Sequence, residues 1–219
     1  MATGIGPDIV EDGLVLALDA GSTRSYPGTG TTWYDLSPTG ANFPLSDAGI
    51  YSAGTMNYTS DRSTLAPPTA WQSTTDLTIE TWYKPESGGI HTGCCDTIFG
   101  RYDFRFFQIG TLLYTMISFT AANGSRYYQH PNVTLSYGEY HHIVGVRRDN
   151  RFIIWADGVQ RHNSTFGSGL PLYSVGSGWN ISSTTHSDVD IDINRIYNRG
   201  LSDDEILQNF NSQKSRFGL

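Results

Sequence analysis

The stretch Tyr140–Gln160, YHHIVGVRRDNRFIIWADGVQ, contains two strand-like segments on either side of a short polar turn. The turn residues Asp149-Asn150 separate Tyr140–Arg148 from Arg151–Ala156, and both residue types tolerate the left-handed backbone of a tight hairpin turn. A second tight turn is predicted at Asp157-Gly158. The stretch therefore predicts an antiparallel hairpin.

Apolar residues fall on both faces of this hairpin. Successive strand residues point to opposite faces, yet the neighbours Ile143 and Val144 are both apolar, as are Ile153 and Ile154. A strand that is covered on one face only alternates apolar and polar residues. We therefore expect the hairpin to lie centrally in its sheet, with its second face covered by another layer of the chain, a ligand or a neighbouring subunit.

The rest of the chain repeats this alternation of strands and turns. Leu77–Lys84 is the clearest amphipathic strand, which Pro85 is expected to end, and Val189–Tyr197 is the last strong one. Strand-like segments spaced about 8–12 residues apart are typical of a sandwich or barrel. With 219 residues, 24 glycines and 13% aromatic residues, the chain suits one large all-β domain over residues 1–219, with a polar lead-in at 1–12.

A short helix is predicted at residues 201–210, after the last strand. Ser202 is a suitable N-cap, and Glu205 three positions later completes a capping box. Ile206 and Phe210 are four positions apart, so they mark the side of the helix that we expect to be buried.

Composition argues against several classes of function. The net charge is −7 with only two lysines, so no nucleic-acid partner is expected, because neutralising phosphates supplies most of that affinity. No stretch reaches the ~18 apolar residues of a membrane span. Residues 1–11 lack the basic start and apolar run of a signal peptide, so we expect synthesis in a cytoplasm. The adjacent Cys94-Cys95 cannot bridge distant strands, and we expect a reduced pair in a loop.

Three segments resemble one known family. Gly13–Ser37, GLVLALDAGSTRSYPGTGTTWYDLS, is similar to the opening of laminin-G-like domains found in phage and viral structural proteins. The strand His141–Val144 with the later Asp157-Gly158 resembles their core hairpin, and Arg195–Glu205 resembles their closing strand and helix. The resemblance implies a concanavalin A-like jelly roll: an all-β, antiparallel two-sheet β-sandwich with a short C-terminal helix.

The resemblance also carries the functional expectation. It implies a non-enzymatic structural protein of a virus particle, namely a bacteriophage capsid decoration (cement) protein or a tail component. Its partners would then be other virion proteins and further copies of itself, and its location the virion. The first alternative is a glycan-binding module that attaches to surface glycans of a host, and the second is a glycoside hydrolase.

The hydrolase alternative depends on the pattern Asp188-x-Asp190-x-Asp192. Alternate strand residues project from one face about 6.7 Å apart, and a pair of carboxylates on one face is what a glycosidase requires. The competing interpretation is a solvated strand face, with Val189, Ile191 and Ile193 pointing inward. We favour that interpretation and expect no enzyme, because the strand lacks the glutamates of the related hydrolases.

Other candidate sites rest on residue type alone. His141 and His142 point to opposite faces of a strand, so they cannot chelate one metal together. The resemblance admits a calcium site and implies no other cofactor. Loop carboxylates for calcium are Asp103, Asp149 and Asp157, and aromatic residues for a sugar-binding face are Tyr102, Tyr127, Tyr128 and Trp155.

Overall fold

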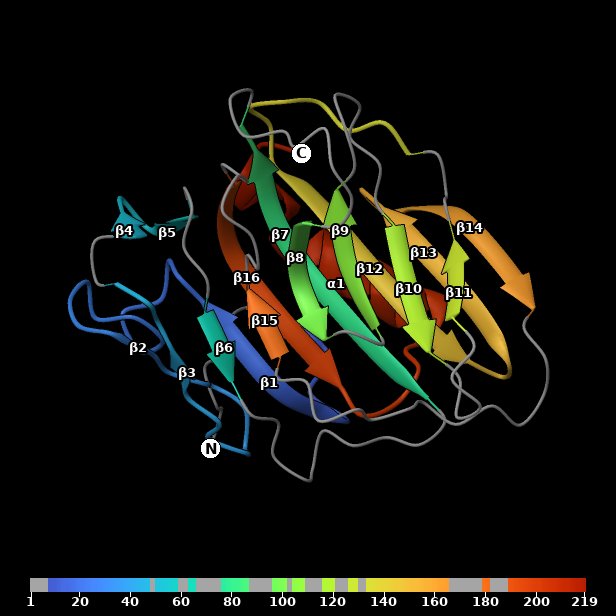
Figure 1. Cartoon of the computed structure of the whole chain (residues 1–219), viewed down its shortest axis with the longest axis horizontal. Helices are drawn as coiled ribbons and strands as arrows, with labels where there is room; N and C mark the ends of the chain where they lie inside the picture. The colour runs from blue at the N-terminus through green and yellow to red at the C-terminus, as the bar shows by residue number, and fades with distance from the viewer. Residues whose placement is uncertain are drawn as a thin grey trace.

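The computed structural model, drawn in Figure 1, describes residues 8–47, 50–58, 63–65, 76–86, 96–101, 104–108, 116–120, 126–129, 133–165, 179–181 and 189–219. Within them the chain forms two facing antiparallel sheets, a two-stranded ribbon and a C-terminal helix. The predicted mostly-β sandwich with one C-terminal helix is confirmed. Among these residues, no helix has both the length and the apolar character needed to cross a membrane.

The larger sheet has eight strands among the described residues. Its central strands are long, and the two at one edge are short. In spatial order it runs β14 (Val159–Thr165), β13 (Arg151–Ala156), β12 (His141–Arg148), β7 (Leu77–Pro85), β16 (Val189–Tyr197), β5 (Thr55–Tyr58) and β4 (Tyr51–Ser52), and β1 (Leu14–Asp19) also pairs with β16.

The smaller sheet faces the larger one, as Figure 1 shows. Its spatial order is β11 (Arg126–Gln129), β10 (Met116–Thr120), β9 (Phe104–Gln108), β8 (Asp96–Arg101), β15 (Trp179–Ile181) and β6 (Ser63–Leu65). A separate ribbon pairs β2 (Thr32–Trp33) with β3 (Phe43–Pro44). Most of the predicted strands are therefore present. The expectation that Pro85 ends the strand at Lys84 is wrong by one residue, because Pro85 is itself the last residue of β7.

The hairpin that the sequence predicted is formed by β12 and β13. Asp149 and Asn150 both have positive φ, at 51° and 56°, and Arg148 pairs with Arg151 across the two-residue turn. Asp157 and Gly158 also have positive φ and connect β13 to β14. The hairpin is central, since β12 pairs with β7 on one side and β13 pairs with β14 on the other.

The main hydrophobic core lies between the two sheets. Ile79 and Tyr83 of β7 and Ile143 of β12 pack in one cluster with Phe99 of the smaller sheet. Trp33 of the ribbon belongs to the same cluster and is fully buried. The inward faces of both sheets therefore share one core.

The outward face of the larger sheet carries a second hydrophobic cluster. Val144, Val146 and Trp155 pack there with Leu201 and with Ile206 of α1 (Asp203–Gln213). Figure 1 shows α1 behind the larger sheet, on the side away from the smaller sheet. Of the three coverings expected for the hairpin's second face, the structure shows another layer of the chain. The protein's own helix thus covers this apolar face.

The helix begins as predicted and extends further. Ser202 caps it, and the side chain of Glu205 returns the bond to the Ser202 backbone, which completes the capping box. The predicted end at Phe210 is wrong, because α1 continues to Gln213 and is followed by the 3-10 turn η3 (Lys214–Phe217). This extension carries the chain across the sheet to the candidate site.

Candidate functional site

A pocket of about 660 Å³ opens on the outward face of the larger sheet. Its walls come from the β4–β5 turn, the end of β7, Tyr140 just before β12, the start of β16, and the C-terminal residues Arg216 and Phe217. Its volume lies within the ~300–1,000 Å³ that is usual for small-molecule sites. In the described part of the chain, five segments that are distant in sequence therefore line this pocket.

A β-bulge in β16 brings two carboxylates to this pocket. Ile191 pairs with Tyr83 and Ile193 with the next residue, Trp82, so Asp192 is the extra residue of a bulge. Cross-strand partners share a face, and Trp82 stacks on residues of the C-terminal segment, so Ile193 points outward. The expectation that Ile193 points inward is wrong, because the bulge reverses the alternation.

Asp190 is held by two donors. Its Oδ1 accepts a hydrogen bond of 2.7 Å from Asn57 Nδ2, and its Oδ2 lies 2.7 Å from Lys84 Nζ. Lys84 also contacts Glu86 at 2.8 Å. The hydrogen bonds to Asp190 and Glu86 raise the pKa of Lys84, so the amine stays charged.

Asp192 accepts from a tyrosine and an arginine. Tyr140 donates its hydroxyl proton to Oδ1 at 2.9 Å, and Arg216 Nη2 lies 3.3 Å from Oδ2. Burial raises the pKa of Asp192, against the opposing effects of the Thr55 and Tyr140 hydrogen bonds and of the Arg216 charge. Asp190 and Asp192 are only 6% and 7% exposed, so the expected solvated strand face is wrong: both carboxylates are buried and paired.

Arg216 connects the C-terminal turn to two strands. Its Nη1 lies 2.8 and 3.0 Å from the two carboxylate oxygens of Asp19 on β1, while Nη2 contacts Asp192 on β16. A Cβ at Gly21 would lie 2.3 Å from Nη2, so the absence of a side chain there makes room for the guanidinium. The ion pairs of Arg216 and the space left by Gly21 therefore hold η3 in place as one wall of the pocket.

Aromatic stacking holds the other side of that wall. Phe217 stacks on Trp82 with a centroid distance of 4.3 Å and lies 4.9 Å from the ring of Tyr140. Trp82 in turn stacks with Phe210 of α1 at 5.9 Å. Phe217 is half-buried, which leaves part of its ring to line the pocket.

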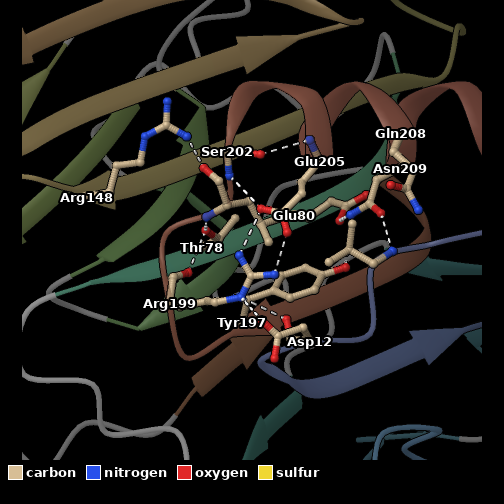
Figure 2. Close-up of polar contacts among 12 residues, drawn as sticks. Asp12, Thr78, Glu80, Arg148, Tyr197, Arg199, Ser202, Glu205, Gln208 and Asn209 are labelled. Carbon is tan, nitrogen blue, oxygen red and sulfur yellow. Dashed lines mark hydrogen bonds and ion pairs between the residues drawn. The ribbon is translucent and has the colours of Figure 1, made fainter.

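A buried polar network fixes α1 on the sheet and so supports the pocket. Glu80 of β7 is fully buried; its Oε1 accepts from Arg195 at 2.8 Å and lies 2.9 Å from His142 Nε2. Its Oε2 accepts from Asn209 of α1 at 2.8 Å. Figure 2 shows Glu80 lying between the sheet and the helix, beside Tyr197 and Asn209. Because η3 follows α1 directly, this network also positions Arg216 and Phe217.

The structure brings some of the predicted site residues together. Asp190 and Asp192 share the pocket, whereas Asp188 lies outside the described residues, as do Tyr102, Asp103, Cys94 and Cys95. Tyr127 and Tyr128 lie in β11, but their side chains are outside the described part of the chain.

Trp155 and the two described calcium candidates lie elsewhere. Trp155 is 7% exposed and packs in the outward cluster under α1. Asp149 and Asp157 lie at opposite ends of β13, on the order of 20 Å apart for a six-residue strand and its flanking turns, so they do not form one site. Within the parts of the chain that the structure describes, no three His, Cys, Asp or Glu residues are grouped to hold a metal ion.

The histidines behave as the strand geometry predicted. His141 lies with Nδ1 2.8 Å from Asp157 Oδ2, while His142 points to the other face and contacts Glu80. Burial lowers the pKa of His141, but the hydrogen bond and charge of Asp157 outweigh it, so the net pKa is raised. Asp157, which lies in the β13–β14 turn, is therefore paired with His141.

Sequence reasoning missed Asn57, Lys84, Tyr140, Arg216 and Phe217 as pocket residues. One signal was available: in the alternating strand Leu77–Lys84, Lys84 falls on the same face as Glu80 and Trp82. A lysine at that place in a chain with two lysines is a candidate partner for a strand carboxylate.

The chain belongs to the concanavalin A-like lectin/glucanases superfamily, whose laminin-G-type family model matches residues 57–207. The concanavalin A-like part of the predicted resemblance is confirmed by this match. No match was found among curated protein sequences.

Solved structures show the same fold. The binding domain of Paraclostridial Mosquitocidal Protein 1 matches with a TM-score of 0.69 and 14% identity over 92% of this chain and 52% of that chain. The binding domain of Botulinum Neurotoxin DC, solved in complex with SialylT, matches with a TM-score of 0.69 and 11% identity over 93% of this chain and 52% of that chain. Trypanosoma rangeli sialidase, in complex with sialic acid, gives 0.65 and 16% over 92% of this chain and 33% of that chain.

At such low identity the similarity shows the fold alone, and the chain spans about half of the toxin chains and a third of the sialidase chain. The three proteins named are toxins and a sialidase, so the expected phage link rests on the sequence resemblance and gains nothing from them.

Proposed function

We propose that this chain is a carbohydrate-binding domain that takes part of a glycan into the outward-facing pocket. The observation that carries the proposal is the set of buried, pre-paired carboxylates beside two half-buried aromatic rings, Tyr140 and Phe217. Fixed polar groups with apolar surface next to them are the usual composition of a small-molecule site. Membership of a superfamily of lectins and glucanases also supports a carbohydrate-binding function.

The carboxylates are suited to hold sugar hydroxyl groups. Each carboxylate offers about four acceptor positions, and Asn57 and Lys84 use two of those on Asp190. The remaining positions accept from ligand hydroxyl groups, and hydrogen bonds to an ionised acceptor are the stronger kind. Because their partners already fix these side chains, little conformational entropy is lost on binding.

A glycan array followed by calorimetry tests this proposal. The wild-type chain is compared with Phe217→Ala, which removes one of the two aromatic rings of the pocket, and with Asn211→Ala, an exposed change on α1 away from the pocket. We expect binding to at least one glycan, a loss of ten-fold or more in affinity for Phe217→Ala, and no change for Asn211→Ala. An array without any binder, with and without calcium, would contradict the proposal.

The proposal includes binding without hydrolysis. Asp190 is an ion-paired carboxylate whose two oxygens already have partners, which suits a fixed acceptor better than a nucleophile or base that must reach a sugar carbon or water. The hydrolase alternative predicts measurable release of reducing sugar that Asp190→Ala and Asp192→Ala abolish. Glycan binders from the array serve as the substrates for this assay.

A structural role in a virus particle is a separate proposal. It is supported by the resemblance of Gly13–Ser37 and Arg195–Glu205 to phage-type laminin-G-like domains. In that role the domain would sit on a virion, as a decoration or tail protein in contact with other virion proteins or further copies of itself, and present its pocket to host glycans. Mass spectrometry of purified particles tests it. A copy number matching the main shell protein supports decoration, a few copies support the tail, and absence contradicts both.

A further inference from the structure

We infer that the outward-facing pocket selects uncharged, hydroxyl-rich sugars and rejects acidic sugars such as sialic acid. The inference rests on the proposed carbohydrate-binding function and specifies its ligand class. Its basis is the way in which the charges around the pocket are already paired.

Among the described residues that line the pocket, both cations are paired with carboxylates of the chain. Lys84 Nζ contacts Asp190 at 2.7 Å and Glu86 at 2.8 Å. Arg216 contacts both oxygens of Asp19 and one oxygen of Asp192. An acidic sugar is usually recognised by an arginine or lysine that is free to pair with its carboxylate. In this pocket such a ligand would have to displace an internal carboxylate from its partner.

The balance of charge also disfavours an anion. Among the described residues that make these ion pairs, two cations face four carboxylates, those of Asp19, Glu86, Asp190 and Asp192. Asp190 and Asp192 are nearly buried, so solvent screens them less than surface charges. A ligand carboxylate entering the pocket would therefore meet net negative charge, and the whole chain, at −7, adds to this repulsion.

The same groups favour an uncharged sugar. The unused acceptor positions of Asp190 and Asp192 match the hydroxyl protons that sugars donate in abundance. The rings of Tyr140 and Phe217, with centroids 4.9 Å apart, offer apolar surface for the C–H face of a sugar ring. Tyr140 already donates its hydroxyl proton to Asp192, so the ring is held in place before a ligand arrives.

Calorimetry on matched pairs of oligosaccharides tests the inference, with lactose and 3′-sialyllactose as one pair and each neutral binder from the array with its sialylated counterpart as the others. We expect the neutral member to bind at least ten-fold more tightly. Glu86→Gln removes one carboxylate partner of Lys84 outside the pocket lining. This variant should therefore bind the acidic member several-fold more tightly than the wild type does, which reduces the difference in affinity between the two members of a pair.

Two results separate the possible failures. If the acidic member binds as tightly as the neutral one, and Phe217→Ala weakens both, the ligand class is wrong while carbohydrate binding stands. If neither member of any pair binds, the proposed function is wrong and the inference falls with it. Asp190→Asn is a second test. It should weaken binding of the neutral sugar, because charge-assisted acceptors are lost, and it should reduce the electrostatic repulsion of the acidic sugar.

Discussion

Asn209 of α1 donates a hydrogen bond of 2.8 Å from Nδ2 to Oε2 of Glu80 on β7, a residue 129 positions earlier in the chain. The same amide donates to the hydroxyl of Tyr197 at 2.9 Å and accepts at Oδ1 from the backbone of Val10 at 2.9 Å. One fully buried side chain therefore connects the N-terminal segment, two strands of the larger sheet and the C-terminal helix.

We expect Asn209→Ala to lower the free energy of unfolding by about 2–3 kcal/mol, because it leaves buried donors and acceptors without partners. Asn211→Ala makes the same substitution at an exposed position of the same helix and should change stability by less than about 0.5 kcal/mol. Urea unfolding followed by circular dichroism measures both. Equal stabilities for the two variants would show that the Asn209 contacts contribute nothing.

Glu80 should make the protein sensitive to acid. Burial alone would raise its pKa, but the charge of Arg195 and the hydrogen bonds from His142 and Asn209 lower it to about 2. Below pH 4.5 the unfolded chain takes up a proton at this residue while the folded chain does not, so acid favours unfolding. The stabilisation is complete above pH 4.5 and is lost as the pH falls toward 2.

Urea unfolding across that pH range, on the wild type and on Glu80→Gln, measures this effect. Glu205 also has a pKa lowered to about 2, through its hydrogen bond to Arg199, and contributes in the same window. The comparison isolates Glu80, since the variant keeps Glu205. We expect Glu80→Gln to be less stable at neutral pH and to show a shallower loss of stability in acid. Parallel pH profiles would contradict the assignment.

Gly158 lets the β13–β14 turn pack against α1. Its φ is +74°, and a Cβ there would lie 2.7 Å from ring atoms of Phe210. Gly138 has nearly the same φ, +72°, with no atom within 4 Å of its virtual Cβ. Alanine at either position incurs the left-handed backbone cost of roughly 1–2 kcal/mol, so the difference between the two variants isolates the contact with Phe210.

We expect Gly158→Ala to be less stable than Gly138→Ala by at least about 1 kcal/mol, because inserting an atom into a packed contact is itself destabilising. Thermal and urea unfolding of both variants provide the values. A Gly158→Ala protein as stable as Gly138→Ala would mean that Phe210 does not pack on this turn.

Much of the fold could be predicted because its signals are local. Asp149 and Asn150 tolerate the positive φ angles that their turn requires, so the turn can be predicted from these two residues. The capping box at Ser202 and Glu205 marks the start of α1 within four residues. The apolar residues on both faces of β12 and β13 correctly indicated two covered faces. What covers the second face was left open, because it depends on how residues 201–217 return across the sheet.

The site was predicted only in part because it depends on pairings between distant segments. The bulge at Asp192 exists only in the register of β16 against β7, and a strict two-residue alternation cannot show it. The pairing of Lys84 with Asp190 and of Arg216 with Asp19 joins residues 106 and 197 positions apart. The sequence showed the carboxylates but not the partners that pair with them.

His141 offers a probe of the turn that follows β13. Burial lowers its pKa, yet the hydrogen bond and charge of Asp157 raise it above the usual value of 6.5. Asp157→Asn keeps an acceptor for the backbone N–H of His142, and Asn tolerates the positive φ of this position, but the charge is removed. We expect the pKa of His141 to fall in this variant, as measured by NMR titration of the imidazole protons.

Asp149→Asn is the matched control, since Asp149 also has positive φ in a hairpin turn but lies at the other end of β13. It should leave the His141 titration unchanged. A histidine whose folded pKa is raised contributes stability that is complete below pH 6.5 and is lost as the pH rises through the folded pKa. The wild type and Asp149→Asn should therefore lose some stability on passing this range, whereas Asp157→Asn should not. An unaltered His141 pKa in Asp157→Asn would show that the raised value has another source.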